Sequence, residues 1–265
     1  MSAASRTFSL CLFSCCLCAA AWAGDSKDIV TDRPDFVDAP EALDAGVWQL
    51  ETSVAWERNT RDGANERSWS TPTLLRYGLG HGLEFRFGSD GRVWQRSTDS
   101  SGMPTRTNGW ADATLGLKWH FLEGKDGAPS MGVLFDLDLD SGSDGLRGNG
   151  VRPSVKLSAG WDLPDEIELG IMPGIVFDKD DSGKRFTSGL LGIVLGREYA
   201  KGKRAFIELS LPRVTSNRHG GTQASFDVGG AWLLTPNSQI DTALSRGLNS
   251  KTPEWSWTLG YSVRF

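Results

Sequence analysis

The sequence predicts an all-β protein, an antiparallel transmembrane β-barrel of about 12 strands of the outer-membrane type. The first observation behind this prediction is an alternation of apolar and polar side chains, which begins at Gly46 and continues to Phe265. The second is that no stretch combines a 3.6-residue period with helix caps. The third is that long and short links alternate between the predicted strands, as in barrels with short periplasmic turns and longer outer loops.

Residues 1–23 have the layout of a cleaved signal peptide, with one basic residue, Arg6, an apolar run over 8–20 and the sequence AWA before Gly24. The apolar run is too short for a transmembrane helix, which needs roughly 20 residues. All four cysteines lie in this stretch, so the exported chain offers no disulfide and no cysteine metal site. A lipoprotein signal at Cys15 is the alternative interpretation.

Residues 24–45 are rich in Asp, Pro and Ala and have no period, which predicts an extended periplasmic segment before the barrel of residues 46–265. Within the barrel the alternation predicts twelve strands. Their ranges are 46–57, 68–77, 82–96, 107–121, 130–140, 151–161, 166–178, 185–198, 203–212, 222–233, 237–245 and 254–265.

The links between the predicted strands are of two kinds, short and long. An even number of strands places the start of the first strand and the end of the last strand on one side of the membrane. The last strand is expected to pair with the first, because an unpaired edge in lipid leaves backbone groups without partners. The short links include GLGH (78–81), DLPD (162–165) and LTPN (234–237), with 122–129 as a longer one on that side. The long links, rich in polar residues, are 58–67, 97–106, 141–150, 179–184, 213–221 and 246–253.

The strand that contains MGVLFDLDLD shows the two faces most clearly. Its apolar residues predict a lipid face, and Asp136, Asp138 and Asp140 predict a luminal face. The neighbouring strands place basic residues inward, which favours an ion-pair network. A calcium loop is the alternative, but Ser141 and Arg147 stand where an EF-hand loop starting at Asp136 needs Gly and Glu.

A barrel of about twelve strands has a wider lumen than a barrel of about eight strands, which side chains just fill, and a narrower lumen than a 16-stranded porin. We therefore expect a constricted or partly plugged pore. Both charge signs point inward, which gives no ring of a single sign to select ions. The candidate lumen and constriction residues are Arg76, Glu84, Arg86, Lys118, Asp136, Asp138, Asp140, Arg152 and Lys156.

Composition and motifs exclude several functions. The formal net charge of -5 argues against a nucleic-acid partner. There is no phosphate-binding glycine loop and no metal-spaced cluster, so no cofactor is expected. A barrel hydrolase would need a nucleophile beside a histidine, and none of the three histidines is followed by the pattern H-x-S, so no catalytic residue is predicted. A barrel with a structural or adhesive role remains the alternative to a channel.

Several short stretches resemble the outer-membrane transporter family named after the meta-pathway of phenol degradation. The resemblance runs from Thr31 to Phe265 and departs from the expected pattern at Val37 and Ala39. The stretches that carry it are TDRPDFVDAP (31–40), GVWQLE (46–51), TPTLLRYGL (71–79), LEFRF (83–87), DATLGLKW (112–119), RGLN (246–249) and the closing SVRF.

The resemblance implies a barrel in the bacterial outer membrane that passes small, often aromatic or hydrophobic, compounds. Outer-membrane lipids, the barrel-assembly machinery and a small solute are the expected partners, and the oligomeric state is left open. A terminal strand with Tyr261, Val263 and Phe265 resembles the insertion signature of such barrels. Our hypothesis for the N-terminal stretch is a periplasmic plug that uses the candidate residues Asp32, Arg33 and Asp35.

Overall fold

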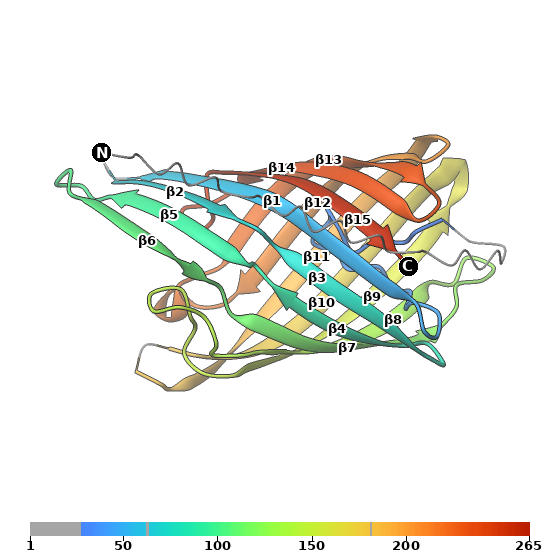
Figure 1. Ribbon diagram of the computed structural model, residues 1–265, viewed down its shortest axis with the longest axis horizontal. Coiled ribbons are helices and arrows are strands. Elements are labelled where there is room, and N and C mark those ends of the chain that lie inside the picture. Colours follow the sequence, from blue (N-terminus) through green and yellow to red (C-terminus); the bar gives the residue numbers. More distant parts are fainter. Residues whose placement is uncertain (1–27, 62–63, 181) are drawn as a thin grey trace, which may run out of the picture.

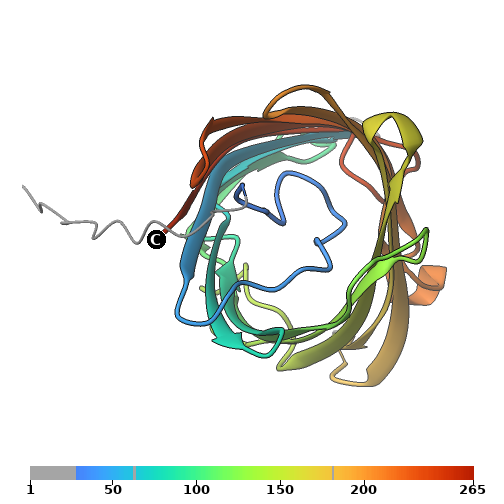
Figure 2. The same ribbon diagram turned by 90° about the vertical axis from the view of Figure 1, so that its right-hand side faces the viewer.

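The computed structural model describes residues 28–61, 64–180 and 182–265. The predicted signal peptide, residues 1–23, lies outside the described residues. The described chain forms a 15-stranded antiparallel sheet that closes on itself, because the last strand pairs with the first (Figures 1 and 2). The predicted barrel fold is therefore confirmed, and so is the pairing of its two terminal strands.

The described elements are strands in nearly unbroken succession, as predicted. Two short 3-10 turns lie in the connections between strands. Among the described residues, no helix is long and apolar enough to cross a membrane. The elements are β1 (Trp48–Arg61), β2 (Ala64–Ser70), β3 (Thr73–Gly80), β4 (Leu83–Ser89), β5 (Arg92–Thr98), β6 (Pro104–Trp110), β7 (Ala113–Leu122), β8 (Ser130–Asp138), β9 (Arg152–Leu163), η1 (Pro164–Glu166), β10 (Ile167–Lys179), β11 (Arg185–Ala200), β12 (Lys203–Val214), η2 (Asn217–His219), β13 (Gln223–Thr235), β14 (Ser238–Gly247) and β15 (Trp255–Arg264).

Three of the twelve barrel strands are each divided in two by a short interruption, which is why fifteen strand segments form a twelve-stranded wall. The interruptions lie side by side between β2 and β3, between β4 and β5, and between β6 and β7. The Thr71 amide donates to the Asp90 carbonyl oxygen (3.1 Å), and the Ala111 amide donates to the Gly91 carbonyl oxygen (2.9 Å). β1 is continuous and pairs with β3 near its start and with β2 near its end.

Short turns join strands at one end of the barrel and longer connections join them at the other, as predicted. Two of the predicted long links are wrong in extent, however. Residues 58–61 and 64–67 are strand, and so is half of 97–106, because β1, β2, β5 and β6 extend further than predicted (Figure 1). The sequence prediction ended these strands where the apolar residues end, although the backbone pairing continues with polar side chains on both faces.

The wall has the reverse of a soluble protein's polarity. Arg76, Glu84 and Lys118 point into the lumen and are at most 1% exposed, whereas Phe135 and Leu137 point outward and are about half exposed. A band of outward apolar side chains is what a lipid bilayer covers, and a closed barrel leaves no unpaired strand edge inside it. The fold is therefore that of an outer-membrane barrel.

Candidate functional site

Residues 28–47, which we call the luminal segment, run inside the barrel and not along its rim (Figure 2). Both ends of the luminal segment are held at the end of the barrel that carries the short turns. The Ile29 amide donates to the Pro236 carbonyl oxygen (2.8 Å), and the Gly46 amide donates to the Gly78 carbonyl oxygen (2.9 Å). The segment therefore enters the lumen, crosses it and returns to the start of β1 on the same side.

Asp32 is the centre of a buried ionic cluster between the luminal segment and the wall. Its two carboxylate oxygens accept hydrogen bonds from Lys118 Nζ at 2.9 and 3.0 Å, and it also accepts one from Arg86. Arg76 Nη1 lies 3.5 Å from Asp32 Oδ2. The Lys118 ammonium group also donates to the Ala39 carbonyl oxygen (2.9 Å), so it ties two parts of the segment together.

Two wall carboxylates hold the same cluster from the other side. Arg76 donates two hydrogen bonds to Glu84 (2.7 and 2.9 Å) and one to Glu51 (2.8 Å). Glu84 in turn accepts from the Leu43 amide (3.0 Å), and Glu51 accepts from the Asp32 amide (3.1 Å). Each buried charge therefore has partners of opposite sign or backbone donors, as buried ionic groups require.

Asp35 attaches the luminal segment to β12, across the barrel from the Asp32 cluster, and Asp38 attaches it to β4 and β9. Arg204 donates two hydrogen bonds to the Asp35 carboxylate, at 3.0 and 2.7 Å. Asp38 accepts from Arg86 at 2.9 Å and from Lys156 at 2.7 Å. Arg86 therefore bridges Asp38 to the Asp32 cluster.

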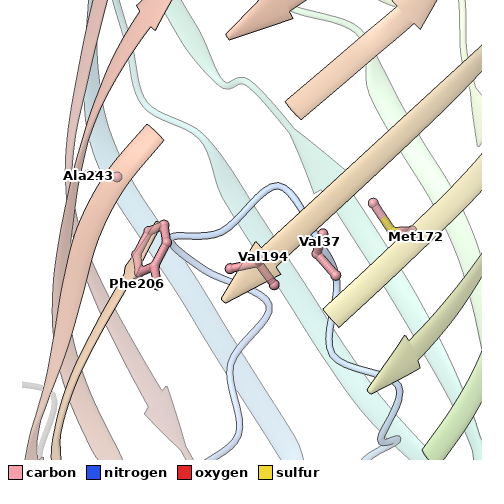
Figure 3. Packing of buried hydrophobic residues seen from close by; sticks show 5 residues of the cluster. All are labelled: Val37, Met172, Val194, Phe206 and Ala243. Carbon is pink, nitrogen blue, oxygen red and sulfur yellow. The ribbon is translucent and has the colours of Figure 1, made fainter. Parts of the chain in front are cut away.

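A small apolar contact lies beside these ion pairs, where Val37 of the luminal segment packs on the inner wall (Figure 3). Glu208 accepts hydrogen bonds from the Phe36 amide (2.8 Å) and the Val37 amide (2.9 Å). These bonds fix the segment's backbone at this point. The wall residues of the cluster are Met172, Val194, Phe206 and Ala243.

The luminal segment separates two chambers within the barrel. The chamber toward the long connections has a volume of about 1000 Å³ and the chamber toward the short turns about 560 Å³. Among the described residues, only Arg33, Asp35 and Asp38 line both chambers, and all three belong to the segment. We call these three residues, which lie between the two chambers, the partition.

Arg33 differs from the two carboxylates of the partition. Asp35 and Asp38 are held in ion pairs, whereas Arg33 forms no ion pair within 4 Å with the part of the chain that the structure describes. Its Nε atom is buried and has no hydrogen-bond partner there. Asp90 and Asp241 attract the Arg33 guanidinium group only from beyond ion-pair distance, so it is the one charged group of the partition without a close ionic partner in the described chain.

The charges of the chambers differ from those of the partition. Nine carboxylates and eight Arg or Lys side chains line the larger chamber, so its charge is nearly balanced. Seven carboxylates and three Arg or Lys side chains line the smaller chamber, which is therefore acidic. Charged side chains of both signs therefore line each chamber.

The acidic groups of the luminal segment respond differently to their surroundings. Burial alone would raise the pKa of Asp32, but Arg76, Lys118 and Arg86 outweigh it and hold that pKa well below its ordinary value. Burial also opposes ionisation of Asp38, and Lys156 and Arg86 still lower its pKa. Burial raises the pKa of Asp35, because Arg204 offsets the burial only in part.

The structure brings most of the predicted luminal residues into one network with the segment. Lys156 lies 3.1 Å from Asp136 and joins it to Asp38. The predicted residues that surround the segment are Arg76, Glu84, Arg86, Lys118, Asp136 and Lys156, together with the plug candidates Asp32 and Asp35.

The other predicted luminal residues lie apart from this network. Arg152 pairs with Asp112 at 2.8 Å and approaches Asp138 only to 4.0 Å, in the larger chamber. Asp140 follows the end of β8 and lies near Arg147 (3.9 Å) on the connection to β9. The three aspartates therefore do not form one ladder, because the strand ends at Asp138.

Sequence reasoning missed several groups that hold the segment. Asp38 is the third acid of TDRPDFVDAP, and its spacing from Asp32 and Asp35 was the available signal. Gly78 and Gly132 allow the luminal segment to lie close against the wall. A Cβ atom would lie 1.8 Å from the Asp44 carbonyl oxygen at Gly78 and 2.5 Å from the Pro40 carbonyl oxygen at Gly132. No sequence pattern marks these two glycines, because the approach of the segment creates their role.

Comparison with known proteins gives one family match. The model of the family described as "Putative MetA-pathway of phenol degradation" matches residues 31–265. No curated protein matches the chain.

Solved structures share the barrel at low sequence identity. An outer membrane channel from Pseudomonas putida F1 is similar with a TM-score of 0.67 and 16% identity, over 85% of this chain and 98% of that one. The β domain of the Bordetella autotransporter BrkA gives 0.51 and 16%, over 83% and 99%. The KdgM porin in complex with disordered oligogalacturonate gives 0.51 and 11%, over 80% and 99%. At these identities the likeness concerns the fold.

Proposed function

The chain belongs to the family described as the MetA-pathway of phenol degradation, and from that premise we propose that it is an outer-membrane channel for the passive entry of small solutes. The observation that carries the proposal is the partition of the lumen. Two polar chambers meet at Arg33, Asp35 and Asp38, and the luminal segment that supplies them is attached through side chains and single backbone hydrogen bonds, not as a strand of the wall. A segment held in this way can set the width of the passage.

We propose further that the solutes are small anions, aromatic acids among them. Support comes from Arg33, the cation at the partition that forms no ion pair with the described residues. A guanidinium group binds a carboxylate with two parallel hydrogen bonds, which a neutral alcohol cannot reproduce. The family's association with the degradation of phenol is consistent with small aromatic solutes.

Single-channel conductance of the purified protein in planar bilayers tests the role of the segment. The variant D32N/D35N/D38N removes the three carboxylates that anchor the segment, and we expect larger and noisier conductance steps than in the wild type. The matched control is D28N/E41Q/D44N, which removes three acids of the same segment whose side chains form no ion pair within 4 Å in the described chain. Equal conductance in the wild type and both variants would contradict the gating role.

The variant R33Q tests the solute. We expect its permeability for benzoate to fall several-fold relative to that for benzyl alcohol, measured by swelling of protein-containing liposomes. A folded barrel that never conducts, with or without the segment's carboxylates, would favour a structural role over a channel.

A further inference from the structure

The outer ends of four neighbouring strands carry a row of arginines, which is separate from the lumen. Arg58 on β1 lies directly opposite Arg67 on β2, Arg67 lies opposite Arg96 on β5, and Arg96 lies opposite Arg106 on β6. The four side chains therefore share one face of the sheet. We call Arg58, Arg67, Arg96 and Arg106 the arginine row.

The arginine row faces outward and not into the lumen. Trp56 lies opposite Trp69, and Trp69 lies opposite Trp94, each two residues from an arginine of the row and therefore on the same face. Trp69 and Trp94 are both 45% exposed, like the outward apolar residues of the band below them. The same strands turn Glu57, Glu66 and Gln95 to the other face, where Gln95 donates to Glu66.

The row lies just beyond the apolar band. On β7 and β6 the outward side chains run from Phe121 to Trp110 before Asn108 and Arg106, and on β1 they run from Trp48 to Trp56 before Arg58. Tryptophans gather at the level where hydrocarbon meets lipid headgroups. The arginines therefore lie at the headgroup level, at the end of the barrel that carries the long connections, which faces the cell exterior in outer-membrane barrels.

Within the described part of the chain, the arginine row lacks a paired counter-charge. Among the residues that the structure describes, none of the four arginines forms an ion pair with a carboxylate within 4 Å. Arg58 Nε donates to Thr60 Oγ1 at 3.2 Å, which leaves its charge uncompensated. Like charges directly opposite on neighbouring strands destabilise a sheet, so four in a row call for anions from outside the chain.

We propose that the arginine row binds the phosphate groups of an outer-leaflet glycolipid, with the tryptophans beneath it in contact with the acyl chains. Neighbouring strands are about 4.8 Å apart, so the row spans about 14 Å at its base and can contact two phosphates on one headgroup. Guanidinium groups bind phosphate with bidentate geometry, and basic clusters at a membrane surface attract anionic lipids. This lipid site is independent of the proposed passage through the lumen.

The test measures binding of diphosphoryl lipid A to the purified protein in mild detergent by native mass spectrometry. We expect the wild type to bind diphosphoryl lipid A more tightly than the dephosphorylated lipid. The variant R67Q/R96Q should lose affinity for diphosphoryl lipid A by roughly tenfold or more, because each of the two removed side chains contributes about fivefold to binding of an anionic lipid surface. Inorganic phosphate in excess should compete poorly, because it lacks the acyl chains.

The matched control is R197Q/K203Q, which removes two exposed basic side chains at the opposite end of the wall, near the turn between β11 and β12. Its affinity should equal that of the wild type. Wild-type affinity in R67Q/R96Q, or an equal loss in both double variants, would overturn the proposal. If R67Q/R96Q does not fold, the comparison of phosphorylated with dephosphorylated lipid on the wild type decides, and equal binding of the two lipids would overturn the proposal.

Discussion

At the scale of single residues, Lys118 is a buried charge whose partners all lie outside its own strand. Its side chain is fully buried, and its ammonium group donates to Asp32, to the Ala39 carbonyl oxygen and to the Glu41 carbonyl oxygen. All three acceptors belong to the luminal segment. The hydrogen bonds of the Lys118 ammonium group therefore attach β7 to the luminal segment and not to neighbouring strands of the wall.

The variant K118M is expected to loosen the luminal segment by about 3–5 kcal/mol, because removal of one partner of a buried ionic cluster leaves the other charges uncompensated. Hydrogen exchange of the amides of residues 28–47 measures this loss of protection. K125M, at an exposed position in the turn between β7 and β8, serves as the control. Unchanged protection in K118M would show that the cluster does not hold the segment.

Gly78 has the closest contact with the luminal segment, since a Cβ atom there would lie 1.8 Å from the Asp44 carbonyl oxygen. The variant G78A is expected to displace the entry of β1 and to destabilise the barrel by about 1–3 kcal/mol. Thermal unfolding followed by circular dichroism measures the effect. G88A is the control, because its nearest contact would be an ordinary 3.7 Å, and equal losses in the two variants would contradict this explanation.

At the scale of elements, the luminal segment acts as a separate unit attached by charge. Asp32 and Asp38 have lowered pKa values, so their contribution to attachment is fully present above the ordinary aspartate pKa of about 3.9 and is lost as the pH falls through the lowered values. Asp35 has a raised pKa, so its effect on attachment has the opposite sign. Its protonation as the pH falls strengthens attachment, because it removes the cost of burying the charge.

Conductance is therefore expected to stay constant or to fall slightly between pH 7 and about pH 4, and to rise below about pH 4 as the segment detaches. A pH series of single-channel recordings at constant ionic strength measures this. D32N/D35N/D38N should show a weaker pH dependence than the wild type. A rise in wild-type conductance already between pH 7 and pH 5 would contradict the assigned roles of Asp32 and Asp38.

At the scale of the whole molecule, the two kinds of connection define an orientation in the membrane. All four cysteines lie within residues 1–23, so a single cysteine introduced into residues 46–265 is the only cysteine of that part of the sequence. S100C lies on the connection between β5 and β6, and K125C lies on the turn between β7 and β8. A membrane-impermeant maleimide should label S100C on intact cells and K125C only after permeabilisation, and the reverse pattern would overturn the orientation.

The sequence by itself determined the barrel and its twelve strands, because a two-residue period identifies strands and assigns the two faces within each uninterrupted one. It placed Arg76, Glu84, Arg86 and Lys118 inside for the same reason. The period is a local property, and it shifts by one residue at the interruption between β4 and β5, since Glu84 and Arg86 point inward whereas Trp94 and Arg96 point outward.

Only the tertiary structure decided how the lumen is divided. Asp32 lies 86 residues from Lys118 and Asp38 lies 118 residues from Lys156, and closure of the barrel brings each pair into contact. The end of β8 at Asp138 and the arginine row depend in the same way on strand register. Register and the path of a segment without a period are set by contacts between distant residues, which no local pattern in the sequence encodes.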